Sequence, residues 1–261
     1  MRGATCRRRI WRWIAVFVLV LTVSCIHAQK LTETSTEVRF QLDLHVPEDA
    51  LKGFLPAGWT SNVATQGAAK DANLREIFVD CLAINGPDGK PLGNGSNRYV
   101  YLVAPVKDPS GANVQLVLGG LTDDPANAPG PWGNFLLAAT HKVKRGTSAE
   151  SGSNVDSQDW VFAAPTGEHI EMHIQFHKGV GNRGKRTETK YYSAKDPALY
   201  QDSQQEQVLD ILRNVTTNPP DRVRKFSFKA SGGAYAKLFA GPVPVLSWDN
   251  ILWIDRAVTK P

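Results

Sequence analysis

The sequence is poor in cysteine and lacks the short motifs of several enzyme classes. Three cysteines in 261 residues are too few for the disulfide framework of a small secreted domain. No Gly-x-Ser-x-Gly elbow, Ser-x-x-Lys pair or His-Glu-x-x-His segment is present, so nothing local supports a serine hydrolase or a zincin. There is also no internal repeat and no long Ser/Gly-rich linker. With 42% hydrophobic residues, the composition excludes intrinsic disorder and favours one domain with a substantial core.

Residues 1–28 contain no acidic residue and have the pattern of a secretory signal peptide. Five arginines precede an apolar run, Ile14 to Val23, and small residues follow this run as far as Ala28. The run is shorter than the roughly 20 residues of a membrane-spanning helix, so we expect cleavage after Ala28 rather than retention as an anchor. The protein is therefore expected to be exported, periplasmic or secreted, by the Sec route or, given Arg7-Arg8-Arg9, the twin-arginine route. Thr22 disfavours acylation at Cys25, because leucine is usual at that position of a lipobox.

The basic character of the chain resides in this leader. The formal net charge is +5, but removing the five leader arginines from the 30 basic residues leaves 25, which equals the 25 acidic residues. A neutral mature chain argues against a nucleic-acid partner, and we expect no membrane association after cleavage. Cys81 then remains as a single thiol inside an apolar run, which is typical of a packed small hydrophobe rather than a nucleophile.

Residues 29–261 are predicted to form a single mainly β domain. Alternating or apolar runs predict strands over 36–46, 74–84, 98–106, 113–118, 135–143, 160–163, 169–177, 187–192, 223–229, 234–239 and 243–254. Pro47 opens a short helix, and Asp196-Pro197 opens an amphipathic one that ends before Pro219. Segments 121–133 and 146–156 are expected to be loops, the first covering a barrel mouth. The prediction is one closed or nearly closed antiparallel, lipocalin-like β-barrel with a few short helices.

Two sequence motifs, a glycine-rich segment and a histidine-containing strand, could indicate a functional site but also have a purely structural explanation. Residues 179–184 fit Gly-x-Gly-x-x-Gly, but the segment that follows alternates like a strand, whereas a dinucleotide site needs a helix there. A glycine-rich hairpin turn that pairs 187–192 with 169–177 is favoured. On the strand 169–177, His169, Glu171 and His173 share one face. Neighbours two residues apart could share a metal, but a polar barrel face explains the pattern better.

Residues 40–56, FQLDLHVPEDALKGFLP, resemble the start of the acetoacetate decarboxylase-like family, where a strand runs into a short x-x-x-A-L-x-x-x-L-P helix. Residues 168–176 resemble a later strand of that family, and residues 236–246 resemble its L-F-D-G region. The resemblance implies a lipocalin-like barrel around a ligand cavity. In the family's decarboxylases it also implies a lysine, in a Pro-Lys-Lys context, that forms a Schiff base with a β-keto acid.

The family's lysine pair has no counterpart in this sequence. The corresponding segment, residues 131–137, holds Trp132 but no lysine, and the nearest lysines are Lys142 and Lys144, which share a strand face. The resemblance also implies a cavity arginine and glutamate, for which Arg39, Glu76 and Arg98 are the nearest candidates. We take Arg98, Glu76 and Trp132 as candidate substrate-binding residues.

Three functions follow from these observations. The first is an exported carbon–carbon lyase that acts on a small carbonyl or carboxylate compound in an internal cavity. Lys142 or Lys144 would supply an amine or cation, and Glu171 or His173 acid–base catalysis. The second is a non-catalytic periplasmic barrel that binds an apolar or aromatic small molecule. The third is a metal-assisted lyase or hydrolase using His169, Glu171 and His173. The first two need neither a cofactor nor a metal, and a homo-oligomer is left open.

Overall fold

The computed structural model describes residues 30–126, 130, 132–150, 152–213, 222–233 and 235–260. The predicted signal peptide, the centre of the proline-rich loop and the segment 214–221 lie outside the described residues. The elements are β1 (Lys30–Leu44), α1 (Glu48–Lys52), β2 (Thr60–Ser61), β3 (Leu74–Asn85), β4 (Asn97–Lys107), β5 (Asn113–Thr122), β6 (Phe135–Leu137), β7 (Thr140–Glu150), β8 (Ser153–Ala163), β9 (His169–His177), β10 (Asn182–Arg183), β11 (Thr187–Ser193), β12 (Tyr200–Arg213), β13 (Val223–Ser231), α2 (Tyr235–Leu238) and β14 (Val245–Lys260).

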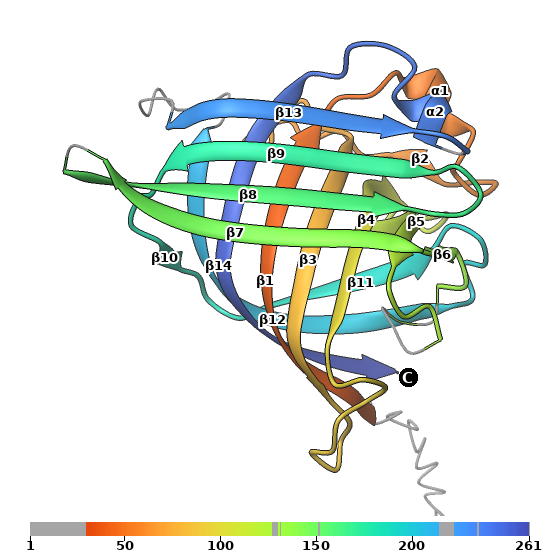
Figure 1. Ribbon diagram of the computed structural model, residues 1–261. Helices are drawn as coiled ribbons and strands as arrows, with labels where there is room; N and C mark the ends of the chain where they lie inside the picture. The colour runs from red at the N-terminus through yellow and green to blue at the C-terminus, as the bar shows by residue number, and fades with distance from the viewer. Residues whose placement is uncertain are drawn as a thin grey trace, which may run out of the picture.

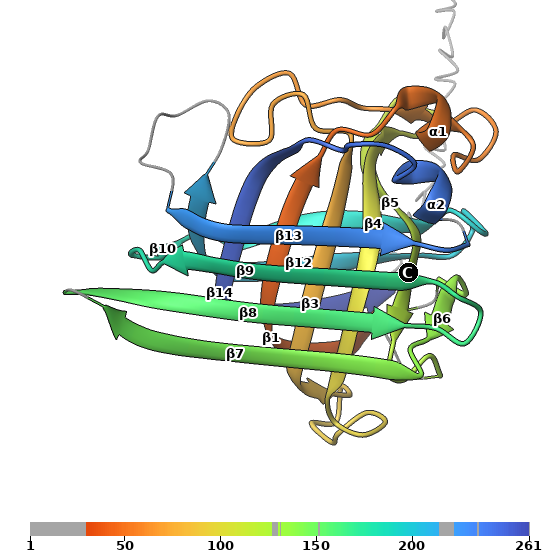
Figure 2. The ribbon, with the colours of Figure 1, turned by 45° about the horizontal axis from the view of Figure 1, so that its top comes forward.

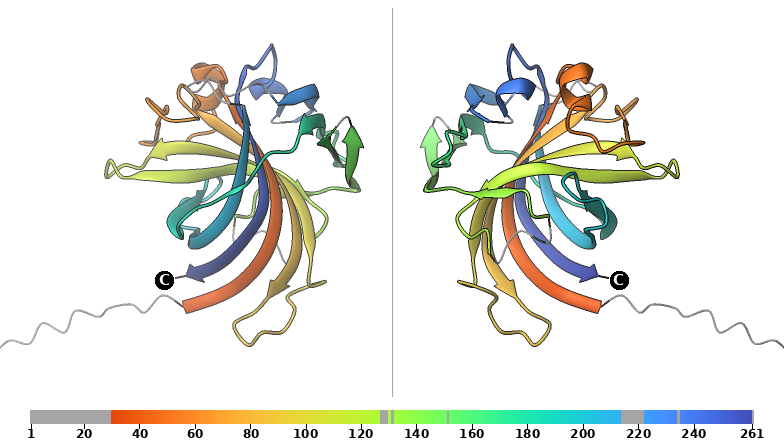
Figure 3. Two further views of the ribbon diagram at one scale, coloured as in Figure 1. Left: turned by 90° about the vertical axis from the view of Figure 1, so that its left-hand side faces the viewer. Right: turned by 90° about the vertical axis from the view of Figure 1, so that its right-hand side faces the viewer.

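Seven long strands close into a barrel, which confirms the predicted mainly β architecture. Their order is β4-β3-β1-β14-β12-β11-β5, and β5 pairs with β4 to close the ring. All neighbours are antiparallel except β11 and β5, which run parallel. The first and last strands lie side by side over their whole length, from the Lys30–Lys260 pair to the Leu44–Val245 pair. Figure 3 shows these long strands curving strongly around the interior.

A second sheet of four antiparallel strands, in the order β13-β9-β8-β7, covers one side of the barrel. Figure 1 shows these strands crossing in front of the barrel strands. Each layer contributes one face of alternating apolar residues to the core between them. On β9, Ile170, Met172, Ile174 and Phe176 are buried and their neighbours are more exposed. Phe78 of the barrel meets Trp160 of the second sheet with ring centroids 5.7 Å apart.

The two short helices lie close together at one end of the molecule (Figure 2), where they pack against the core between the two layers. The predicted helix after Pro47 is confirmed as α1, with Glu48 and Asp49 in its first turn, where negative charge favours a helix. α2 replaces a predicted strand over 234–239. In the described ranges, no helix has the length and apolar content needed to cross a bilayer.

The predicted helix after Asp196-Pro197 is wrong, because this segment leads into the strand β12. Asp196 caps only a turn, in which its side chain accepts a hydrogen bond from the Ala198 amide at 3.0 Å. Beyond it, β12 pairs along one edge with β14 and along the other with β11 and β10. A helix in this segment would lose the backbone hydrogen bonds along both edges of the strand. It would also remove Gln201 and Ser203 from the barrel interior.

Three other local predictions are also corrected. The expected loop 146–156 is the turn end of the β7–β8 hairpin, where Gly146 pairs with Ser157 and the chain reverses around Gly152, at φ +84°. Polar residues suit this hairpin because β7 is an edge strand with a solvent-facing side. The expected strand 135–143 is two strands, β6 and β7, in different sheets. β11 pairs with β12 and β5 rather than with β9.

The glycine-rich segment 179–184 connects the two sheets and is not a hairpin turn. A strand, β11, follows it, so the absence of a dinucleotide-binding helix is confirmed. The glycines are needed for close approach: a Cβ on Gly179 would lie 1.9 Å from the Arg222 guanidinium, and one on Gly181 would lie 2.6 Å from Val208 Cγ1.

Candidate functional site

The barrel interior is polar at its centre because β1 places charged residues on its inner face. Val38, Phe40 and Leu42 face the second sheet, so the alternate residues Glu37 and Arg39 face the interior. Arg256 enters from β14, which pairs with β1 through Ser35. All three charged side chains are at most 7% exposed.

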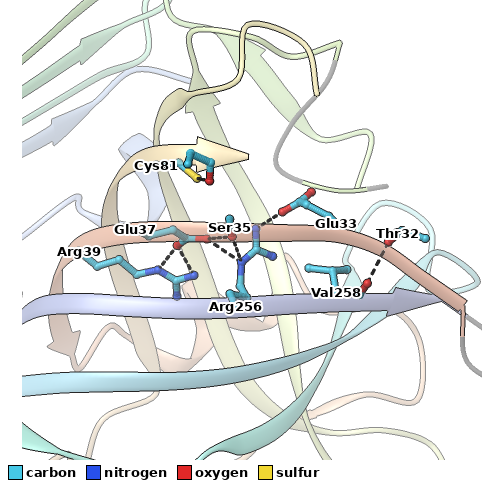
Figure 4. Close-up of polar contacts among 9 residues, drawn as sticks. Thr32, Glu33, Ser35, Glu37, Arg39, Cys81, Arg256 and Val258 are labelled. Carbon is cyan, nitrogen blue, oxygen red and sulfur yellow. Dashed lines mark hydrogen bonds and ion pairs between the residues drawn. The ribbon is translucent and has the colours of Figure 1, made fainter. Parts of the chain in front are cut away.

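Glu37 bridges the two arginines (Figure 4). Its Oε2 accepts a hydrogen bond from Arg39 Nε at 2.6 Å and forms an ion pair with Arg39 Nη2 at 2.5 Å. Its Oε1 accepts from Arg256 Nε at 2.6 Å and from the Ser35 hydroxyl at 2.7 Å. Arg256 Nη2 also binds Glu33. The two cations and two carboxylates balance, which is the arrangement under which buried charges are tolerated.

This network shifts the ionisation of its members. Burial acts to raise the pKa of Glu37, but Arg39, Arg256 and the Ser35 hydroxyl outweigh it and lower the pKa to about 2. Burial acts to lower the pKa of Arg39, but Glu37 together with Tyr101 and Tyr99 outweighs it, and the net shift is upward. Burial raises the pKa of Tyr101 to about 12, partly opposed by Arg39. The centre of the barrel therefore holds a fixed pair of cations and neutral phenols.

An aromatic wall stands beside this network and encloses a cavity of about 20 Å³. Tyr99, Tyr101, Trp132 and Tyr191 form the wall, and Gln201, Ser203, Arg39 and Arg256 complete the lining. A volume of this size holds about one water molecule. The buried hydroxyl of Ser203, a lining residue, has no hydrogen-bond partner among the described residues. Arg39 binds Glu37 through Nε and Nη2, and its Nη1 makes no hydrogen bond to a described residue.

The segment that resembles the family's lysine region lies against this cavity. Trp132 is 3% exposed, and its carbonyl oxygen accepts a hydrogen bond from the Ser193 hydroxyl at 2.6 Å. Phe135 packs on Tyr99 and Tyr101, with ring centroids 6.3 and 6.2 Å away. Aromatic rings thus stand where the resemblance implied an amine, and none of the cavity-lining residues is a lysine.

The four candidate catalytic residues lie elsewhere, on the outer face of the second sheet. Lys144, Asp159 and His173 pair directly across β7, β8 and β9, and Lys142 and Glu171 occupy the adjacent row. His173 Nδ1 is 2.8 Å from Asp159, and its Nε2 is 2.5 Å from Glu171. These two carboxylates raise the pKa of His173. The residues are therefore neighbours, but they face away from the core and do not line the cavity.

The three candidate binding residues are separated. Trp132 lines the barrel interior. Glu76 points the opposite way, into the core between the layers, and is completely buried. Arg98 lies in an open polar groove of about 540 Å³ between the layers, where it and Arg145 both bind Asp80. Of the family-implied candidates Arg39, Glu76 and Arg98, only Arg39 lines the cavity inside the barrel.

His169, Glu171 and His173 do not converge on one point. His169 Nε2 is 3.4 Å from Glu171, while His173 already binds Glu171 and Asp159. Throughout the described part of the chain, no group of three or more His, Cys, Asp or Glu residues is arranged to hold a metal ion.

Sequence reasoning missed most of the interior site, namely Glu37, Arg256, Tyr99, Tyr101, Tyr191, Gln201 and Ser203. A signal for Glu37 was available, since Glu37 and Arg39 alternate with apolar residues on a strand that the sequence predicts. Arg256 gives no such signal, because it is 219 residues from the carboxylate that it binds.

Fold and interior together define a closed β-barrel with an arginine-containing, aromatic-walled cavity. Comparison with solved structures finds the same fold in an acetoacetate decarboxylase-like enzyme from Sphingomonas wittichii RW1, with a TM-score of 0.53 and 11% identity over 88% of this chain and 92% of that one. The family resemblance in the sequence is therefore confirmed at the level of the fold.

Two further structures are similar at lower scores. They are an acetoacetate decarboxylase from Legionella pneumophila subsp. pneumophila str. Philadelphia 1 (TM-score 0.46, 12% identity, 88% and 85% of the two chains) and the enduracididine biosynthesis enzyme MppR (0.47, 10%, 92% and 89%). No protein-family model matches the sequence, and neither does any curated protein.

Proposed function

We propose that this chain is an exported barrel protein that takes up a small carboxylate with a planar or aromatic carbon skeleton in the barrel interior. The observation that carries the proposal is the buried Arg39, which is held by Glu37 through Nε and Nη2 and faces the aromatic-walled cavity. A cation fixed in a water-poor interior is a preorganised anion site.

The lining suits the two ends of such a ligand. A guanidinium is planar and matches a carboxylate, so Arg39 Nη1 offers the carboxylate a donor that no described residue uses. Tyr99, Tyr101 and Trp132 offer ring faces to the carbon skeleton. Because the empty space holds about one water, binding requires the Trp132 side chain to move away from the cavity.

The same lining argues against carbon–carbon lyase chemistry that proceeds through a Schiff base. A Schiff-base route needs a neutral amine at the reacting carbonyl, and the cavity-lining residues include no lysine. Lys142 and Lys144 lie on the exposed outer face. We therefore favour binding of a small carboxylate or carbonyl compound over imine-dependent decarboxylation, although the fold is shared with a decarboxylase-like enzyme.

Titration with phenylpyruvate, benzoate and toluene tests this function. Trp132 emission should change saturably with the two carboxylates and not with toluene, and the change should vanish in Trp132→Phe. Arg39→Gln should weaken carboxylate binding about tenfold or more, the loss of roughly one charge-assisted contact. Lys142→Gln and Lys144→Gln are matched controls with unchanged affinity.

Two results would contradict the proposal. One is equal affinity for toluene and benzoate, which would indicate an apolar pocket without an anion site. The other is a lysine adduct after borohydride treatment with phenylpyruvate that is lost in Lys142→Gln or Lys144→Gln, which would restore the amine role. Export is tested separately, since the extracytoplasmic protein should begin at Gln29.

A further inference from the structure

A second enclosed space lies between the two layers, next to α2 and on the opposite side of β4 from the barrel interior. Its volume is about 70 Å³, roughly five times the space that one water requires. Its apolar lining includes Phe54, Leu102 and Leu136, and its polar lining consists of Asn134, Glu168 and Tyr235. No lysine, arginine or histidine is among the lining residues.

Glu76 lies beside two residues that line this space and has no hydrogen-bond partner among the described residues. On β3 it pairs with Leu42 of β1 and with Leu102 of β4, a lining residue, and it acts electrostatically on Tyr235, another lining residue. Its side chain is completely buried, and neither carboxyl oxygen has a hydrogen bond among the described residues. Burial raises its pKa well above the usual value. An unpartnered carboxyl in an apolar core opposes folding, so its retention points to a ligand.

The other polar residues around the space also offer hydrogen-bond acceptors, and no positively charged side chain lines the space with them. Asn134 donates to the Val117 carbonyl at 2.8 Å, but its own Oδ1 is buried and unpartnered. Glu168 is 9% exposed, and among the described residues its carboxylate accepts a hydrogen bond only from the Thr166 hydroxyl. Burial, reinforced by the negative charges of Glu76 and Glu168, raises the pKa of Tyr235. Both carboxyl groups therefore act on the one phenol that lines the space.

We propose that this interlayer pocket binds a small primary ammonium compound. An ammonium group has three donors and no acceptor, which matches the two carboxyl groups and the Asn134 amide oxygen. Its positive charge would pair with Glu168 and with Glu76, which would release its proton to the solvent when the cation binds, and its short carbon chain would contact Phe54, Leu102 and Leu136. Phe54 and Tyr235 also offer ring faces to a cation. The site is separate from the barrel interior, where arginines select the opposite charge.

Calorimetric titration of the full chain with n-propylammonium, 1-propanol and propionate tests the proposal. Propylammonium should bind saturably, and 1-propanol of similar size should bind about tenfold more weakly or not at all, because it brings no charge. Propionate should not bind at this site. Glu76→Gln should weaken propylammonium binding about tenfold or more, while Glu171→Gln, on the outer face, is the matched control with unchanged affinity.

Further measurements distinguish loss of binding from a folding defect, and distinguish the interlayer pocket from the cavity inside the barrel. Glu168→Gln should also weaken binding. Saturating benzoate, the probe of the barrel interior, should leave propylammonium affinity unchanged. The proposal is overturned if propylammonium binds no better than 1-propanol, or if Glu76→Gln and Glu168→Gln, shown by circular dichroism to be folded, both keep full affinity.

Discussion

At the scale of single residues, this protein keeps carboxyl groups in three different buried environments. Glu37 is paired with two arginines, Glu76 has no partner, and Asp249 lies near a like charge, Asp43. The same chemical group therefore stabilises the fold in the first environment and opposes it in the other two. Each environment gives a distinct dependence of stability on pH.

Replacing Glu37 should be strongly destabilising. Glu37→Gln leaves Arg39 and Arg256 buried without their shared carboxylate, and we expect a loss of about 3–5 kcal/mol in the free energy of unfolding. The folded pKa is about 2, below the ordinary value, so this contribution is complete above about pH 4.5 and is lost as the pH falls towards 2. Urea denaturation at several pH values measures it. A wild-type–variant difference that stays constant down to pH 2 would contradict this account.

Asp249→Asn should change the free energy of unfolding in the opposite direction, by stabilising the fold. Burial and the negative charge of Asp43 raise the pKa of Asp249 to about 7. The unfolded chain therefore loses this proton first, and stability falls as the pH rises from about 4 to 7. The variant should be more stable than the wild type above pH 7, by on the order of 3 kcal/mol in the free energy of unfolding. Melting curves at pH 4 and pH 8 check this, and a variant that melts lower at pH 8 would refute it.

Sequence reasoning reached part of this residue-level arrangement. Arg39 and Glu76 could both be named as candidates through the family resemblance. What could not be read from the sequence is which face of each strand points inward. That choice depends on the second sheet, which covers the face of β3 that carries Glu76 and Phe78 and leaves the face of β1 that carries Arg39 to the interior.

At the scale of elements, alternation predicted most strands correctly and failed where pairing outweighs local pattern. Thr36 to Val46 and His169 to His177 alternate cleanly and form β1 and β9. β12 carries the helical spacing of Val208, Ile211 and Leu212, but it lies between β14 and β11 and gains hydrogen bonds along both edges. Pairing partners that lie far away in the chain are invisible to a local reading.

The β5–β6 pairing depends on a glycine. A Cβ at Gly120 would lie 2.3 Å from the Phe135 ring and 2.4 Å from the Val100 carbonyl oxygen. Gly120→Ala should therefore push β6 and its aromatic ring away from the cavity and destabilise the fold by about 2 kcal/mol. The control is Gly53→Ala, whose nearest contact is 3.5 Å away and which should be nearly neutral. Thermal melts compare the two; equal melting temperatures would rule out the close contact.

At the scale of the whole molecule, closure of the barrel places the two ends of the described chain next to each other. Lys30 pairs with Lys260, so a short linker can connect them. A circular permutant with this linker, opened at the exposed Gly152 turn, should fold and melt in one cooperative transition. A control opened at Val79, inside β3, should not fold. Failure of the first permutant, or folding of both, would show that the β1–β14 seam does not govern closure.

The seam between β1 and β14 also fixes the order of events during synthesis. Arg256, which completes the interior charge network, lies 219 residues after Glu37 and is therefore synthesised long after β1. Until β14 arrives, β1 and β12 each lack a neighbour, and Glu37 lacks one of its two cations. A nascent chain of this design stays open until β14 has been made. The proposed export by the Sec route, which threads an unfolded chain across the membrane, is compatible with this late closure.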